Sequence, residues 1–175
     1  MRLHMREGQD LSRMAVEICY ELQEFHWSRS ALDKLDESDP AYNRTLESVL
    51  LHFRNLRCFF VESHVRDDVS AKDYVQSWNP YLDPVFAATH KNLNKKLAHL
   101  TWSRLTIPRV DWPLREMKTA IDRLFEDFKK ALTPPQDQWF SCVNIGPQGT
   151  ELLASNVYAT ASGPPPKLID SSRKP

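Results

Sequence analysis

The residues with the clearest chemical potential lie between Lys91 and Arg104. His99 carries an imidazole, Lys95 precedes it by one helical turn, and Trp102 follows it by about one turn. Imidazole can transfer protons in RNA cleavage near neutral pH, lysine binds phosphate as a point charge, and tryptophan stacks on bases. The segment therefore predicts an RNA site with His99 as the catalytic residue. The predicted RNA-binding or phosphate-binding residues are Lys91, Asn94, Lys95, Lys96, Trp102 and Arg104.

Charge is distributed unevenly around this segment. Over the whole chain 23 Lys+Arg balance 23 Asp+Glu, which argues against a uniformly basic nucleic-acid coat. Between Asp83 and Asp111, however, there is no acidic residue, whereas acids concentrate in residues 33–39 and 62–73. A simpler interpretation stays open, in which the lysines are solvated or form weak surface pairs with those acidic loops.

The run Asn94-Lys95-Lys96-Leu97-Ala98-His99 resembles the signature of HEPN-domain proteins. Ribonucleases of that family are helical bundles with an arginine a few residues before the histidine. They commonly form homodimers that join two motifs in one RNA-cleaving cleft, and many belong to toxin or antiviral defence systems. The resemblance implies an all-α fold over about residues 10–132 and a metal-independent ribonuclease or RNA-binding protein. The chain as a whole also resembles a bacterial family of no assigned activity.

The chain departs from this signature at Asn94, which stands where the family has arginine. An arginine there would bind the scissile phosphate and stabilise its developing charge. Asparagine can donate a hydrogen bond but brings no charge. Lys91 and Arg104 are the nearby candidates to replace it, and an inactive, RNA-binding form of the fold is an alternative.

Arg57 is the most unusual single placement, because it falls on the apolar face of a predicted helix, four residues after Phe53. An unpaired buried guanidinium is very costly, so we expect an ion pair. The candidate partners are Glu17 or Glu21, and Asp67 or Asp68. The alternative is that Arg57 lines a cleft near His99. Arg54, three residues earlier, is expected to be exposed.

Apolar residues recur at helical spacing along the first three quarters of the chain. The pattern predicts helices that begin after Asp10, near Pro40 and at Pro113, and a long helix over about residues 82–105 that includes Leu82. A short helix is expected within residues 66–75, capped by Asp67 or Asp68. No segment alternates like a half-buried strand. We therefore predict an all-α fold, an antiparallel bundle of four to five helices.

Glycine and proline divide the chain near Leu132. Three of the four Gly and seven of the twelve Pro follow that residue, and both residue types interrupt regular structure. The prediction is a helical bundle domain over residues 1–132 and an irregular, extended or partly disordered C-terminal tail over residues 133–175.

The remaining sequence features argue against membrane, secreted and metal-dependent proteins. No apolar run approaches the roughly 18 residues of a membrane helix, and the polar N-terminus is unlike a secretory signal. Cys19, Cys58 and Cys142 are widely spaced, which is typical of reduced thiols in a cytoplasmic protein. Because metal-ligand spacings and Gly-rich phosphate loops are missing, we expect neither a metal nor a cofactor. The alternative function is a non-enzymatic interaction or scaffold protein that docks a partner protein or a second copy.

Overall fold

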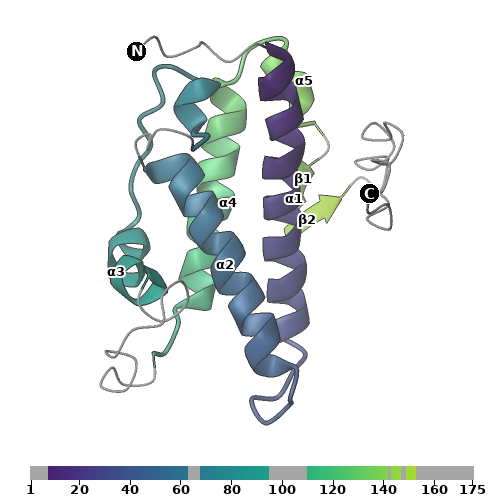
Figure 1. Ribbon diagram of the computed structural model, residues 1–175, viewed down its shortest axis with the longest axis vertical. Coiled ribbons are helices and arrows are strands. Elements are labelled where there is room, and N and C mark those ends of the chain that lie inside the picture. The colour runs from purple at the N-terminus through teal and green to yellow at the C-terminus, as the bar shows by residue number, and fades with distance from the viewer. Residues whose placement is uncertain (1–7, 63–67, 95–109, 142, 147–148, 153–175) are drawn as a thin grey trace, which may run out of the picture.

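The computed structural model describes residues 8–62, 68–94, 110–141, 143–146 and 149–152 (Figure 1). In chain order the described elements are α1 (Gly8–Leu32), α2 (Tyr42–Val61), the 3-10 helix η1 (Ala71–Asp73), α3 (Pro84–Asn92), α4 (Leu114–Ala131), α5 (Gln136–Trp139), β1 (Val143–Gly146) and β2 (Gly149–Leu152). α1 runs antiparallel to α2 and α4 in Figure 1. The predicted all-α antiparallel bundle of four to five helices is confirmed.

Helices α1 and α2 form the centre of the bundle. The predicted stripe of α1 is buried at Ala15, Ile18, Leu22 and Phe25, and α2 buries Phe53 among the residues that face it. α2 begins at Tyr42, two residues after Pro40, and the connection from α1 is a series of hydrogen-bonded turns. Not every apolar residue of α2 is buried, since Leu51 is 45% exposed.

A cluster of aromatic rings holds α4 against the rest of the bundle. Phe128 of α4 is fully buried, with ring centroids 5.5 Å from Phe59 and from Trp78. The indole N–H of Trp78 donates to the Phe60 carbonyl at 2.8 Å. The N–H of the buried indole therefore has a hydrogen-bond partner inside the core. The same bond attaches the segment that follows α2 to the C-terminal part of α2.

α1 begins at Gly8 rather than after Asp10, and α3 and η1 also begin elsewhere than predicted. Asp83 is the N-cap of α3, and its carboxylate accepts from the Val85 amide at 2.9 Å. Leu82 therefore precedes the helix and is 54% exposed, so its predicted place on the buried stripe is wrong. Phe86 instead anchors α3, because it stacks on Phe53 of α2 at 5.7 Å. For η1 the predicted Asp68 cap is also wrong, since Ser70 occupies the N-cap position.

The core continues beyond Leu132. α5 follows almost at once, and Phe140 is fully buried, with ring centroids 5.1 Å from Phe128 and 5.2 Å from Tyr74. β1 and β2 then pair as an antiparallel hairpin beside α1 (Figure 1), an element that the sequence patterns did not predict. Whether residues 1–132 form a domain of their own stays a prediction, but residues 136–140 pack as part of the bundle.

In the parts of the chain that the structure describes, no helix combines the length and the apolar character needed to cross a membrane. Cys19 is buried and Cys58 is half-buried, and neither is part of a disulfide in the part of the chain that the structure describes.

Candidate functional site

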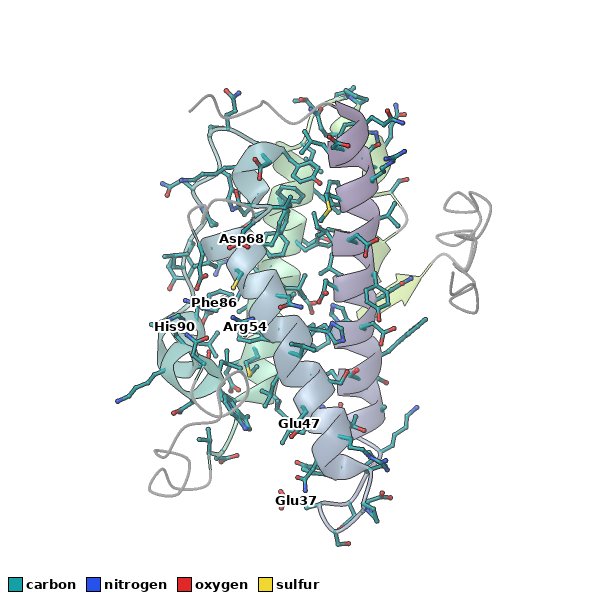
Figure 2. The ribbon with its side chains drawn as sticks, viewed as in Figure 1. Glu37, Glu47, Arg54, Asp68, Phe86 and His90 are labelled. Atoms are coloured by element: carbon teal, nitrogen blue, oxygen red, sulfur yellow. The ribbon has the colours of Figure 1, made fainter. Side chains whose placement is uncertain are left out.

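A group of five polar side chains connects the C-terminal half of α2 with α3. We call it the α2–α3 polar cluster, and it comprises Arg54, Arg57, Glu62, His90 and Asn94. Figure 2 labels Arg54 on α2 and His90 on α3, and the side chain of Asn94 contacts both of them. The stacked pair of Phe53 and Phe86 lies next to the cluster in both helices and sets the distance between them.

The contacts within the α2–α3 polar cluster form one continuous chain. Arg54 Nε donates to Asn94 Oδ1 at 3.4 Å, and Asn94 Nδ2 lies 3.3 Å from His90 Nε2. His90 Nδ1 lies 3.8 Å from Glu62 Oε1, and the same carboxylate forms an ion pair with Arg57. This series of contacts connects α2 with α3, and it orients the partly exposed imidazole of His90 between the Asn94 amide and the Glu62 carboxylate.

The electrostatics of the cluster centre on Glu62. Burial alone would raise the pKa of this carboxyl, but hydrogen bonds with Cys58 and Arg57 and the charges of Arg57 and His90 lower it on balance. Glu62 is therefore ionised at neutral pH. The pKa of the neighbouring Cys58 shifts in the opposite direction. Burial raises the pKa of this thiol most, its hydrogen bond to Glu62 raises it further, and the result is about 11. At neutral pH the raised pKa keeps the Cys58 thiol protonated, as the donor of its hydrogen bond to Glu62.

Only part of the predicted site lies within the described residues. Lys91 is exposed on α3, and Asn94 is half-buried just after it, within the cluster. The predicted catalytic His99 lies outside the described residues, and so do the predicted binding residues Lys95, Lys96, Trp102 and Arg104. The structure therefore joins Asn94 to Arg54 and His90, and the remaining predicted residues stay predictions.

Two expectations about the arginines of α2 need correction. Arg57 is ion-paired as predicted, with a side chain 11% exposed, but its partner is Glu62, the C-cap residue of the same helix. Glu21 was expected there and instead accepts from Asn55 and contacts His52 at 2.7 Å. Arg54 is half-buried rather than exposed, and its Nε donates to the side chain of Asn94, two residues after α3.

Sequence reasoning missed His90, Glu62 and the role of Arg54. One signal was available, because His90 and Asn94 are four residues apart and so lie on one helix face. The pairing of Arg54 with Asn94 had no such signal, since 40 residues separate them and only the packing of α3 on α2 joins them.

The charges of the cluster partly cancel, because Arg57 is ion-paired with Glu62, and Arg54 is the guanidinium of the cluster that could contact an anion. The cluster holds two guanidinium groups and one carboxylate, with the exposed ammonium of Lys91 next to it on α3. Guanidinium groups bind phosphate with directed, charge-assisted hydrogen bonds. Within the described ranges, no three His, Cys, Asp or Glu side chains gather closely enough to hold a metal ion.

Comparisons with protein-family models, with curated proteins and with solved structures found no match for this chain.

Proposed function

We propose that the chain is a cytoplasmic, HEPN-like helical protein that binds or cleaves RNA at the α2–α3 polar cluster and the acid-free segment that follows it. By the same resemblance, it acts as a homodimer in a bacterial toxin or defence module. Two observations support the proposal, namely the motif in the sequence and the contact of the Arg54 guanidinium with the motif's first residue, Asn94.

The observation that carries the proposal is the contact between Arg54 and Asn94. Asn94 occupies the motif position where HEPN ribonucleases have arginine, and the guanidinium of Arg54 hydrogen-bonds to its side chain at 3.4 Å. A positive charge is therefore available at this position even though the motif residue is neutral. In this proposal Arg54 replaces the missing arginine, rather than Lys91 or Arg104, and it binds the phosphate of the RNA.

The roles of the other residues follow from their chemistry. Lys91, Lys95, Lys96 and Arg104 hold the phosphate backbone, and Trp102 stacks on a base. In a cleaving form His99 acts as the general acid and base. In a form that binds without cleaving, the same cations hold the RNA and His99 is dispensable.

A second candidate function is a non-enzymatic interaction protein. The observation that favours it is the exposure of large apolar side chains on the two central helices, since Trp27 of α1 is 55% exposed and Leu51 of α2 is 45% exposed. Trp27 also lines a shallow groove with Ala31, Arg44 and Ser48. Large aromatic side chains of this kind are common in the centres of protein interfaces.

Cleavage of a single-stranded RNA by the purified chain tests the enzymatic form of the proposal, with His99→Ala as the variant. Loss of cleavage in His99→Ala, with RNA binding retained, supports His99 as the catalytic residue. Equal cleavage by both proteins contradicts that role. RNA binding without cleavage by either protein supports the binding form, and no RNA binding favours the interaction protein.

A further inference from the structure

The hydrogen bonds of the α2–α3 polar cluster determine which nitrogen of His90 carries a proton. Arg54 Nε can only donate, so the atom of Asn94 that faces it, at 3.4 Å, is the oxygen Oδ1. The other end of the same amide, Asn94 Nδ2, lies 3.3 Å from His90 Nε2. Since Nδ2 is itself a donor, Nε2 accepts, and the neutral imidazole carries its proton on Nδ1. His90 therefore presents an unprotonated nitrogen on the side of Asn94.

The opposite edge of the His90 imidazole faces a carboxylate. His90 Nδ1 lies 3.8 Å from Glu62 Oε1, and this carboxylate, which also pairs with Arg57, is ionised at neutral pH. A negative charge beside Nδ1 stabilises the imidazolium that forms when Nε2 takes up a proton. A histidine with a carboxylate on one side and an unprotonated nitrogen on the other has the arrangement of a general base.

His90 and Arg54 are both available to a ligand. The His90 side chain is 46% exposed. Arg54 is half-buried, and its Nε contact with Asn94 is its only hydrogen bond to the described parts of the chain, which leaves its two terminal nitrogens for a phosphate. Only the Asn94 amide lies between the two groups. One nucleotide is therefore long enough to contact both the imidazole and the guanidinium.

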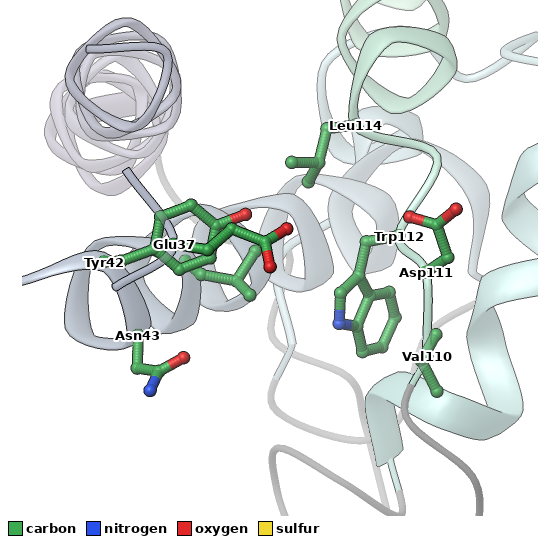
Figure 3. A pocket seen from close by; sticks show the side chains of 8 residues that line it. Glu37, Tyr42, Asn43, Val110, Asp111, Trp112 and Leu114 are labelled. Carbon is green, nitrogen blue, oxygen red and sulfur yellow. The ribbon is translucent and has the colours of Figure 1, made fainter. Parts of the chain in front are cut away.

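The pocket at the N-terminal end of α2 does not offer this combination. It has a volume of about 720 Å³ and lies between Tyr42 and Trp112 (Figure 3). Among its described lining residues there is no His, Lys or Arg. A phosphate would find no cationic group on this lining, and a hydroxyl would find no imidazole, so the α2–α3 polar cluster is the better place for phosphodiester chemistry.

We infer that His90 is a second catalytic histidine, which takes the proton from the 2′-hydroxyl of an RNA nucleotide while Arg54 binds the adjacent phosphate. This role rests on the cleaving form of the proposed function, in which His90 takes over the base step and His99 keeps the acid step. The 2′-hydroxyl replaces Asn94 Nδ2 as the donor to His90 Nε2. Its oxygen then bonds to phosphorus, the bond from phosphorus to the 5′-oxygen breaks, and the leaving oxygen takes up a proton from the acid.

The role of His90 also defines the substrate class. The 2′-oxygen is the nucleophile, so the substrate is RNA, and the products are a strand with a 2′,3′-cyclic phosphate and a strand with a 5′-hydroxyl. An oligonucleotide with a single 2′-deoxyribose on the 5′ side of the cleaved bond is expected to stay intact at that bond. Arg54 contacts the phosphate of either oligonucleotide, so the deoxy substitution should leave the affinity nearly unchanged.

Single-turnover cleavage of a labelled single-stranded RNA by the full chain tests the role of His90. His90→Gln keeps an acceptor for Asn94 but cannot take up a proton, so we expect the cleavage rate to fall about 100-fold or more. RNA affinity and the urea midpoint should stay close to wild type, because the side chain is partly exposed. Free imidazole should restore part of the cleavage to His90→Ala, since it can enter the vacated position, but none to Arg54→Ala.

The possible outcomes separate this role from the proposed function. Cleavage that is lost in His99→Ala but stays within about threefold of wild type in His90→Gln overturns the role of His90 and leaves the proposed function in place. Loss of cleavage in His90→Ala without rescue by imidazole indicates a structural role and also overturns it. So does cleavage of the deoxy-substituted bond at the unmodified rate. A wild-type chain that binds RNA without cleaving it, or does not bind it, overturns this role together with the cleaving form of the proposed function.

Discussion

His26 of α1 and Asp122 of α4 meet inside the bundle, with His26 Nε2 3.2 Å from Asp122 Oδ1 and the His26 side chain only 5% exposed. The second oxygen of Asp122 accepts from Lys118 Nζ at 2.6 Å. Burial alone would raise the pKa of Asp122, but the interactions with His26 and Lys118 outweigh it and lower the pKa below its ordinary value of 3.8. The contact joins two helices that are distant in sequence, so its removal should affect the whole bundle.

Asp122→Asn is predicted to lower the free energy of unfolding at pH 7 by about 1–3 kcal/mol, because it removes the charged partner of both groups. Since the folded pKa is lowered, the contribution of Asp122 is complete above pH 3.8 and disappears as the pH falls through the folded pKa. Urea unfolding at pH 7 and at about pH 3 measures both effects. Asp127→Asn, an exposed change in the same helix, is the control. A difference from wild type that stays the same at both pH values contradicts the prediction.

Phe140→Ala is predicted to lower the free energy of unfolding by about 3–5 kcal/mol, as expected for truncation of a fully buried aromatic ring. The measurement is chemical denaturation, with the exposed Leu51→Ala as the control, for which a change within about 0.5 kcal/mol is expected. An equally small effect of Phe140→Ala would mean that the residues after Leu132 do not contribute to the core.

Substituting the two partners of the Arg57–Glu62 ion pair is expected to reduce the free energy of unfolding by unequal amounts. Glu62→Gln leaves a buried guanidinium without its carboxylate and should cost about 1–3 kcal/mol of stability. Arg57→Met removes the buried charge and keeps an apolar stem, so it should cost clearly less. Denaturation of the two variants side by side provides the test, and a larger loss in Arg57→Met would contradict the explanation.

Cys58 is predicted to resist alkylation. A thiol pKa of about 11 instead of 9.0 gives roughly 100-fold less thiolate near pH 8. Glu62→Gln should lower this pKa, because it removes the negative charge and leaves a weaker, neutral acceptor for the thiol, but not to 9.0, since burial is the largest cause. Iodoacetamide labelling of the Cys58 peptide as a function of pH, read by mass spectrometry, measures the change. A wild-type rate that already levels off near pH 9 would refute it.

The sequence predicted those helices whose apolar pattern is contained within the helix itself. The apolar stripes of α1, α2 and α4 identified the core, because a helix that packs on one side repeats that pattern along its own length. The start of α3 was misplaced because Leu82 has the spacing of the stripe, while the Asp83 cap decides where the helix begins. Phe140 was assigned to an irregular tail because neighbouring prolines dominate the local composition, whereas its burial depends on Tyr74 and Phe128.

The candidate site was predictable only in part, for the same reason. The motif residues and the acid-free stretch can be read along the chain, and Asn94 was named from them. The pairing of Arg54 with Asn94, and of Arg57 with Glu62, depends on how α3 docks on α2 and on where α2 ends.

The most direct test of the central claim is the affinity of the purified chain for a single-stranded RNA oligonucleotide, compared between Arg54→Ala and Arg44→Ala. Both arginines lie on α2, but Arg44 is exposed at the end remote from Asn94. If Arg54 supplies the phosphate-binding charge at Asn94, Arg54→Ala should weaken binding about tenfold and reduce the salt dependence by about one counterion, while Arg44→Ala resembles wild type. Equal affinity of the two variants, or no RNA binding by the wild-type chain, would contradict the claim.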